Sequence, residues 1–361
     1  MILTINSKNL KTAIKHIAPI LGMSLDPNSI YKNHVCFISD EKGTKLLATN
    51  GLVKYEYDLT GVAIVAEPGR VAVVYDKLVT CLEQIKSEAD ILMEYKDKSL
   101  FLKSGKKESQ LKTTSASDFR PIEQFEGAEI QIPFESTQII ERASLTLGRD
   151  PTMKKMHGLL CDLKEVDGYK GMCLKTATPI SASRIFEKFQ CDENVNTSFV
   201  IPEFLVDEAA SKPLKSLCLT SSSIIAKFPN FMIQSPLPEN CFVDVDKHMK
   251  DLSGRDISFV RDELRDTVKF VKSTMDKHSV KMKFAVNDNQ VEVSSFSDTA
   301  KTKDTVKCAS AENFVFTVNS EVLLNFLDSV QESEINLKVS EKSLSYNKDN
   351  YQFVEVCFNM G

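Results

Sequence analysis

The stretch "GTKLLATNG", Gly43–Gly51, holds the pattern that decides the fold. Its segment Lys45–Thr49 is a short predicted strand, and it leads into an Asn-Gly pair that is typical of a tight hairpin turn. A similar stretch, "GMCLKTATP", occupies Gly171–Pro179, and "QVEVSSFSD", Gln290–Asp298, is a weaker third copy. The chain is therefore predicted to build the same hairpin three times.

The spacing of the copies predicts the size of the repeated unit. Ala48 and Ala177 lie 129 residues apart, and Ala177 and Ser295 lie 118 apart. Amphipathic helices are predicted before each hairpin, at residues 9–21, 136–148 and 261–277, and after it, from Tyr75, Pro202 and Asn319. Strand pairs follow each second helix. This order predicts an α+β protein of three domains, residues 1–124, 125–241 and 242–361.

Composition restricts the class of protein. Of 361 residues, 42% are apolar and 26% are charged, which suits a soluble globular chain. No apolar run approaches the roughly 18 residues of a membrane span, and the start of the chain does not resemble a signal peptide. The nine cysteines never form a C-x-x-C motif, so we expect reduced thiols and a cytoplasmic location. The net charge of −5 allows nucleic-acid binding only where basic residues are segregated.

The whole order resembles a known family. Three hairpin copies, "FPNF" at Phe228–Phe231 and an apolar C-terminal strand are similar to the bacterial DNA polymerase III beta subunit, the beta sliding clamp. The resemblance implies two helices packed on an antiparallel sheet in each domain, a half ring per chain and a homodimeric ring around duplex DNA. It implies a processivity factor that tethers the replicative polymerase, with double-stranded DNA, the polymerase and a clamp loader as partners and no cofactor.

A clamp needs basic residues on its helices, and the first helix of each repeat carries some. The predicted contacts would reach phosphates without reading bases, and they would weaken with salt. The candidate DNA-binding residues are Lys8, Lys11, Lys15, Arg142, Arg149, Lys154, Lys155, Arg265 and Lys269.

The resemblance also implies an apolar groove that binds short linear peptides of client proteins. The positions that match it are Met156, Thr178, Ile180, Pro229, Ile233, Val354, Val356 and Cys357. The chain departs from the family pattern at Pro179-Ile180 and in its tail, "FVEVCFNMG". A clamp encoded by a phage or another mobile genome would fit this divergence, as would a different client peptide.

Ring closure, in this family, joins the first domain of one chain to the third domain of another. Leu111, Val271 and Lys272 match the interface positions, although Leu111 is also a candidate core residue. Lys272 and Ser109 stand where the family often has apolar side chains.

No enzyme motif is present, so we expect a protein without catalytic activity. The chain has no glycine-rich phosphate loop, no nucleophile elbow and no histidine pair at metal-ligand spacing. "VDVDKH", Val243–His248, is interpreted as a polar strand face. Two alternatives stay open: a clamp-shaped scaffold that recruits transcription or repair proteins, and an enzyme whose site the sequence does not reveal.

Overall fold

The chain folds into two compact units that are each continuous in space but not in sequence. The computed structural model describes all residues except 22–32, 123–127, 133–135, 167–168, 189–196, 240, 251, 277–279, 297–299, 349 and 359–361. Unit 1 comprises Met1–Ile132 and Leu214–Leu237, and unit 2 comprises Pro133–Pro213 and Pro238–Gly361. Residues 125–241, predicted as one domain, are thus shared between the units, and the three domain boundaries remain a prediction.

One order of elements occurs three times along the chain: strand, helix, three strands, strand, helix, three strands. Short extra elements, β5, α5 and β22, lie between these.

The first repeat comprises β1 (Ile2–Asn6), α1 (Ser7–Leu21), β2 (His34–Asp40), β3 (Gly43–Thr49), β4 (Lys54–Asp58), β5 (Ala63–Glu67), β6 (Gly69–Val74), α2 (Tyr75–Glu83), β7 (Asp90–Lys96), β8 (Ser99–Ser104) and β9 (Lys107–Thr114). The second comprises β10 (Ala128–Gln131), α3 (Ser136–Leu145), β11 (Leu159–Val166), β12 (Tyr169–Thr178), β13 (Ser181–Lys188), β14 (Thr197–Ile201), α4 (Glu203–Ser211), β15 (Ser216–Leu219), β16 (Ser223–Lys227) and β17 (Phe231–Pro236).

The third repeat follows α5 (Val245–His248). It comprises β18 (Arg255–Val260), α6 (Arg261–Lys272), β19 (Lys281–Asn287), β20 (Gln290–Phe296), β21 (Lys301–Lys307), β22 (Ala309–Ser310), β23 (Phe314–Asn319), α7 (Ser320–Ser329), β24 (Glu334–Val339), β25 (Ser343–Lys348) and β26 (Tyr351–Val356).

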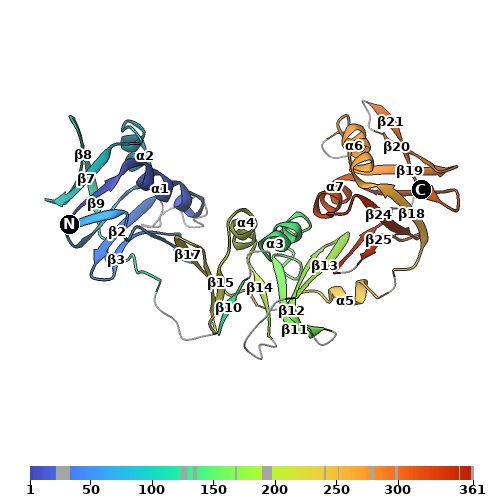
Figure 1. Cartoon of the computed structure of the whole chain (residues 1–361), viewed down its shortest axis with the longest axis horizontal. Coiled ribbons are helices and arrows are strands. Elements are labelled where there is room, and N and C mark those ends of the chain that lie inside the picture. Colours follow the sequence, from blue (N-terminus) through green and yellow to red (C-terminus); the bar gives the residue numbers. More distant parts are fainter. Residues whose placement is uncertain are drawn as a thin grey trace. The chain divides into compact units, whose positions relative to one another are not determined.

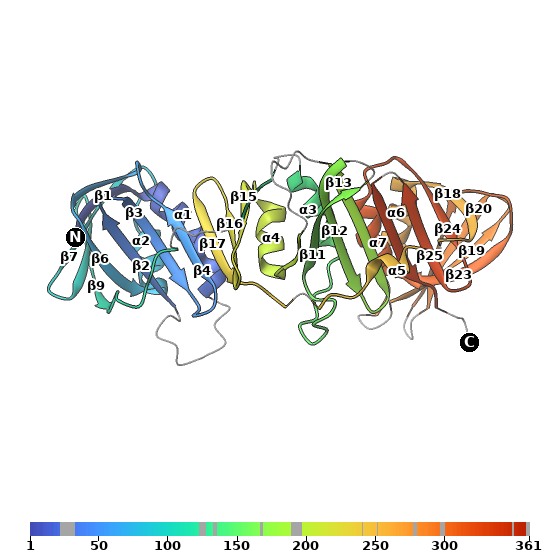
Figure 2. The same ribbon diagram turned by 90° about the horizontal axis from the view of Figure 1, so that it is seen from below.

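In both units helices pack against antiparallel sheets, so the predicted α+β class is confirmed. Unit 1 contains one connected sheet in the order β10-β15-β16-β17-β4-β3-β2-β6-β9-β8-β7-β1-β5, with α1 and α2 against it (Figure 1). Unit 2 contains a sheet in the order β14-β11-β12-β13-β26-β25-β24-β18-β22 and a second in the order β21-β20-β19-β23. Its helices pack in the sequence α4-α3-α7-α6, and Figure 2 shows the strands of each unit from another side.

The helices form where the sequence pattern predicts an apolar face. In α1 the predicted residues Leu10, Ala13, Ile14 and Ile17 are all buried. Asn319 precedes α7, and its side-chain oxygen accepts hydrogen bonds from two backbone N–H groups of the first turn, as predicted for an N-cap. The three first helices end at Leu21, Leu145 and Lys272, so the second and third are shorter than predicted.

The hairpin that opened the sequence analysis is confirmed, but its turn differs from the prediction. β3 and β4 pair as far as Thr49 and Lys54, and the N–H of Asn50 donates to the carbonyl of Val53. Gly51, with φ of 94°, therefore lies within the turn, while the side-chain oxygen of Asn50 accepts hydrogen bonds from the backbone N–H groups of Leu52 and Val53. The equivalent hairpins are β12–β13 and β20–β21.

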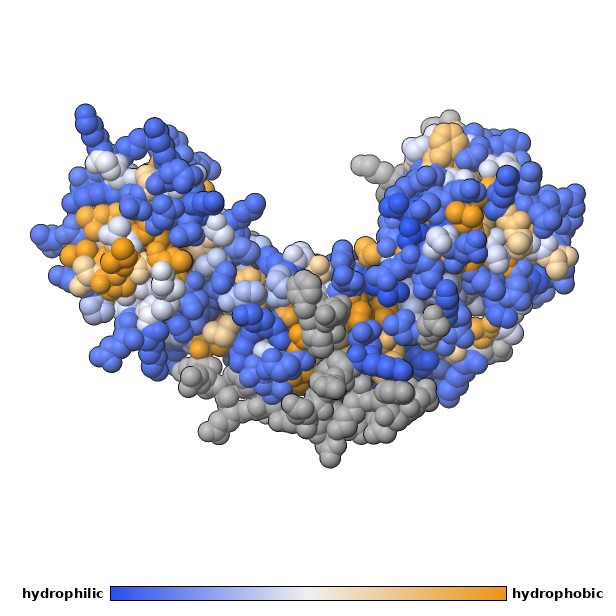
Figure 3. Space-filling view, in the orientation of Figure 1, coloured by the Kyte–Doolittle hydropathy of each residue, from blue (hydrophilic) through white to orange (hydrophobic). Residues whose placement is uncertain are grey.

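On the face shown in Figure 3, hydrophilic side chains predominate and apolar side chains gather in patches, the broadest of them on unit 1. Among the most exposed are Ile64 on β5, at 75%, and Phe270 on α6, at 55%. Within the described part of the chain, no helix has the length and apolar character required to cross a bilayer.

Candidate peptide groove and basic contacts

A groove in unit 2 combines residues from four separate segments. Its volume is about 260 Å³. The lining residues, called the groove below, are Met156, Ala177, Thr178, Pro179, Ile180, Ser181, Ala182, Val243, His248, Ser343, Val354 and Val356. Their side chains are mainly apolar, with a few hydroxyl groups and one imidazole, which is the character expected of a peptide or small-molecule site.

Five predicted groove residues, Met156, Thr178, Ile180, Val354 and Val356, do line this groove. Cys357 does not line it: the residue is only 8% exposed, and burial raises the pKa of its thiol to about 12.

The other two predicted groove positions, Pro229 and Ile233, do not line this groove. Both belong to unit 1, where Pro229 lines a different cavity and Ile233 is a core residue that pairs with Tyr55 of β4.

Residues from α5 complete the groove, and the sequence analysis missed them. "VDVDKH" is not a polar strand face: Val245–His248 form a short helix, and Asp246 points to the sheet. Lys175 on β12 is 5% exposed and binds the carboxylates of Asp162 and Asp246 at 2.6 and 2.8 Å. Arg184 on β13 also binds Asp246, at 3.1 Å. These ion pairs hold α5, and with it His248, against the strands of the groove.

The charges of this cluster are mutually stabilised. Burial alone would raise the pKa of Asp246, but the hydrogen bonds and charges of Lys175 and Arg184 outweigh it, so that the pKa is lowered. Burial would lower the pKa of Lys175, but its two carboxylate partners raise it overall.

Replacing Lys175 by methionine should destabilise unit 2 by about 1–2 kcal/mol at neutral pH, because two carboxylates lose their partner while Asp246 stays partly hydrated. Since the pKa of Asp246 is depressed in the folded state, its stabilising contribution is present above the ordinary aspartate pKa and disappears as the pH falls through the folded value. Urea unfolding at several pH values checks this: the deficit of the variant should shrink in acid. An equal deficit at all pH values would contradict it.

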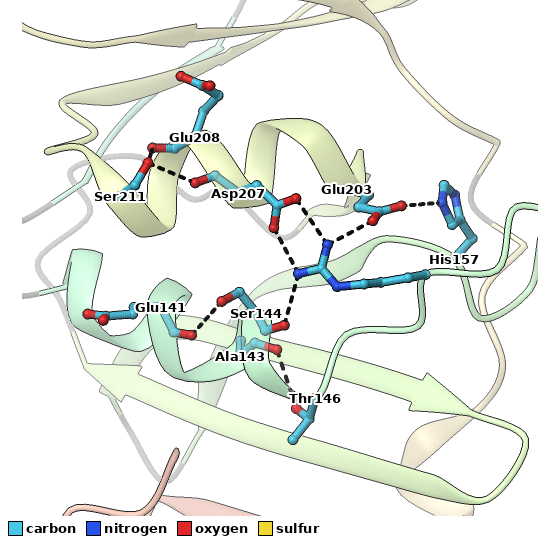
Figure 4. Close-up of polar contacts among 10 residues, drawn as sticks. Glu141, Ala143, Ser144, Thr146, His157, Glu203, Asp207, Glu208 and Ser211 are labelled. Atoms are coloured by element: carbon cyan, nitrogen blue, oxygen red, sulfur yellow. Dashed lines mark hydrogen bonds and ion pairs between the residues drawn. The ribbon is translucent and has the colours of Figure 1, made fainter. Parts of the chain in front are cut away.

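The wall of the groove that contains Met156 depends on the segment Gly148–Gly158. Arg149 donates to both carboxylate oxygens of Asp207, at 3.0 and 2.8 Å, and to Glu203 at 2.7 Å. Glu203 also bonds the ring of His157 at 2.9 Å, and Figure 4 shows these carboxylates of α4 turned toward His157 and the α3 end. The N–H of Gly158 returns to the carbonyl of Gly148 at 3.3 Å. The network therefore fixes the loop that carries Met156.

Glu355 lies between two groove residues but faces inward. It is fully buried, one carboxyl oxygen accepts the N–H of Asn319 at 2.6 Å, and the other has no partner among the described residues. Burial raises the pKa of Glu355 well above its usual range, and the hydrogen bond from Asn319 offsets only part of this.

Replacing Glu355 by glutamine should therefore increase stability at pH 8, by on the order of 1 kcal/mol, and leave it nearly unchanged near pH 4. The sign follows from the raised pKa: the neutral carboxyl is favourable below the ordinary glutamate pKa, and this contribution is lost as the pH rises toward the folded value. Thermal unfolding across this pH range is the measurement. A variant that is less stable than the original chain at pH 8 would show that the carboxyl is stabilised in its charged form.

Four of the predicted DNA-binding residues are engaged inside the protein. Lys11 donates to the carbonyl of Ile85, and Arg265 forms an ion pair with Asp328. Arg142 on α3 donates to the carbonyl of Ser329 at 2.8 Å and lies over the ring of Tyr351. Arg149 is held by the two carboxylates of α4, and their hydrogen bonds raise its pKa. These four side chains therefore bind other parts of the protein, and a phosphate would have to compete with those partners.

The remaining predicted residues, Lys8, Lys15, Lys154, Lys155 and Lys269, are exposed, and in the described part of the chain none of them forms an ion pair. Lys8 and Lys15 lie on α1, Lys269 on α6, and the other two in the loop beside Met156.

The predicted interface residues are mostly not available to a partner. Val271 is 0% exposed and Leu111 is 8% exposed, so both are core residues of their own units. Lys272 is ion-paired with Glu321 at 3.2 Å. The exposed apolar residue of this segment is Phe270, one position earlier. The helical spacing of Leu264, Val268 and Val271 already indicated that Val271 faces inward.

Comparison with known proteins identifies the fold. No family model and no curated protein matches the chain. The crystal structure of DNA polymerase III subunit beta from Pseudomonas aeruginosa matches 99% of this chain and 100% of that chain, with a TM-score of 0.88 and 16% identity. The sliding clamp from Bartonella birtlesii, solved bound to griselimycin, matches 100% of both chains with a TM-score of 0.90 and 13% identity. The beta subunit from Caulobacter crescentus matches 100% of both chains, with a TM-score of 0.87 and 15% identity. The fold of this chain is therefore that of the DNA polymerase III beta subunit, the sliding clamp.

Proposed function

We propose that the protein is a DNA sliding clamp: two copies close into a ring around duplex DNA and tether a replicative polymerase, without catalysing a reaction. The observation that carries this proposal is a strand pairing that the chain uses twice internally and leaves unfinished at both ends.

The first internal pairing joins β4 to β17. Phe231 is the first residue after the two-residue turn between β16 and β17, and it pairs with Tyr57. Tyr57 is the fourth residue after Val53, which ends the turn between β3 and β4.

The second internal pairing joins β13 to β26 in the same register. Tyr351 is the first residue after the turn between β25 and β26, and it pairs with Ile185. Ile185 is the fourth residue after Ser181, which ends the turn between β12 and β13. Two junctions with one register indicate a standard way of joining repeats.

Each end of the chain carries one half of this junction without a described partner. β21 corresponds to β4 and β13, and it is an edge strand. β9 corresponds to β17 and β26; it pairs with β6 only at Thr113 and Thr114, so Lys107–Lys112 have one described neighbour, β8. An open edge invites pairing with another chain.

The shared register specifies which residues of two copies would meet. Lys107 is the first residue after its turn, and the four-residue connection before Lys301 matches that before Lys54. Lys107 of one copy then faces Asp304 of the second, and Glu108 faces Lys303. Both pairs have opposite charges, which favours this register over a shift by one residue. Phe270 belongs to α6, which packs against β21, and it would be covered in the same contact.

Exposed lysines provide the contact with DNA. Lys8, Lys15, Lys154, Lys155 and Lys269 carry the charge, and the chain as a whole is acidic at −5. Such contacts bind phosphates of any sequence and weaken with salt, so that retention depends on the closed ring.

The test compares retention on nicked circular and linear DNA. Purified protein, loaded on DNA circles at low salt, should stay bound through a wash at high salt and should dissociate once the circle is cut. Its mass in solution should be twice the chain mass. Retention on linear DNA at high salt, or a monomer at micromolar concentration, would contradict the proposal.

The groove of unit 2 is the proposed site for client peptides of the polymerase and the clamp loader. Support comes from its apolar lining, which includes residues of β12, β13 and β26, with His248 of α5 beside them. The variant Ile180→Asp tests this site. The variant should still be retained on circular DNA, but it should no longer bind the polymerase. Persistent polymerase binding would locate the site elsewhere.

A further inference from the structure

In three segments of unit 2, a lysine directly precedes a residue that lines the groove. Lys155 precedes Met156, Lys247 precedes His248 and Lys342 precedes Ser343 in the sequence. All three side chains are exposed. These three lysines are called the basic rim below, since each is the neighbour in the sequence of a residue that lines the groove.

The basic rim comes from three distant segments, two of which are held beside the groove by backbone hydrogen bonds and the third by an ion pair. The carbonyl of Lys155 accepts the N–H of Val243 at 2.8 Å, and the carbonyl of Lys342 accepts the N–H of Cys357 at 2.8 Å. Lys247 belongs to α5, which Lys175 anchors to the strands. The positive charges are therefore held at the groove by rigid backbone, although the side chains themselves are free to move.

Few negative charges oppose the rim. Asp244 is the one exposed acid that adjoins a lining residue in the sequence, and its ion pair with Lys247 measures 3.8 Å with both side chains more than half exposed, so solvent screens it. Glu355 also adjoins the lining, but its side chain is fully buried rather than exposed at the rim, and burial raises its pKa, which disfavours the charged carboxylate. Two positions from a lining residue, Lys154 and Lys250 are exposed lysines and Glu341 is an exposed acid. At the same separation, Lys175 and Arg184 are both ion-paired with Asp246.

We propose that the groove selects peptides in which aspartate or glutamate residues directly flank a short apolar core. The apolar side chains would fill the cavity, and the flanking carboxylates would meet the basic rim. This inference depends on the proposed peptide-binding function of the groove, and it specifies the class of peptide. Rim charges of this kind act on association rate and selectivity and are sensitive to salt.

A peptide array tests separately whether the groove binds apolar peptides and whether the basic rim favours acidic flanking residues. It contains ten-residue peptides whose central five positions sample Leu, Ile, Met and Phe, each core made in an Asp-flanked, a Ser-flanked and a Lys-flanked form. Binding of the full chain is measured by fluorescence anisotropy at low and at high salt. We expect the Asp-flanked form of a core to bind about tenfold more tightly than its Lys-flanked form at low salt, and the difference to shrink at high salt.

Two charge-reversal variants, one just before β25 and one at its end, test whether the basic rim contributes to peptide binding. Lys342→Glu should reduce the affinity for an Asp-flanked peptide about three- to tenfold and leave that of the Ser-flanked form nearly unchanged. Lys348→Glu, at the far end of β25 and about 20 Å from Lys342, makes the same charge change on an exposed residue and should have little effect. Equal binding of Asp- and Lys-flanked forms, or equal loss in both variants, would overturn the basic rim while leaving the groove. Failure of every form of every core to bind would overturn the groove itself.

Discussion

Exchanging the charges of Lys107 and Glu108 should weaken self-association by roughly 30- to 1,000-fold. The variant Lys107→Glu with Glu108→Lys places like charges opposite Asp304 and Lys303 in the proposed register. Each cross-strand charge pair is worth roughly 0.2–1 kcal/mol, and repulsion costs a similar amount. A closed dimer contains the interface twice, so about 2–4 kcal/mol is at stake. Sedimentation equilibrium measures the dissociation constant.

The control and the rescue make this experiment specific. Glu41→Lys with Lys42→Glu makes the same exchange in the exposed turn after β2, and it should not change the dissociation constant. Adding Lys303→Glu and Asp304→Lys to the first variant restores opposite charges at both positions and should restore the dimer. A folded four-residue variant that remains monomeric would show that the register is not the one used twice inside the chain.

Local pattern explains why the repeated elements could be predicted from the sequence. Leu10, Ala13, Ile14 and Ile17 of α1 form an apolar face that is visible at helical spacing, and the same is true of α6. The hairpins depend on alternation and on turn residues close in sequence. Boundaries were less accurate, and the Asn-Gly turn was displaced because the side chain of Asn50 forms its own turn with the backbone.

Long-range partners explain why the basic residues were harder to assign. Arg149 is engaged by Asp207, 58 positions away, and Arg142 by the carbonyl of Ser329, 187 positions away. A helix face with an arginine looks the same in sequence whether it meets water, a phosphate or a carboxylate of another helix. Only the packing of α3 against α4 and α7 distinguishes these cases.

Long-range packing also limited how well the groove residues could be predicted. Met156, Ile180 and Val354 were predicted from the resemblance to the clamp family, and all three line the groove. Ile233 was predicted from the same resemblance, but its strand completes the sheet of unit 1, and the alternation of apolar residues does not indicate which sheet a strand joins. His248 was missed because α5 is a single turn with no helical periodicity to detect.

Replacing Gly148 by alanine should reduce peptide binding to the groove by more than a hundredfold. A Cβ at this position would lie 2.2 Å from the carbonyl oxygen of Met156 and 2.3 Å from that of Ala177. Both atoms are backbone, so neither can rotate away, and both residues line the groove. One of the two walls must therefore move, and displacements of this size abolish complementarity in a packed apolar site.

The measurement is anisotropy with any peptide of the array that binds the unaltered chain. Gly61→Ala is the control: its φ of 82° makes alanine unfavourable by about 1 kcal/mol, but no atom lies within 4 Å of the added Cβ. The control should bind peptide normally despite its small loss of stability. Since Gly148 lies far in sequence from β9 and β21, the Gly148→Ala protein should still dimerise. A dimer that also binds peptide with unchanged affinity would mean that clients do not use the surface formed by Met156 and Ala177.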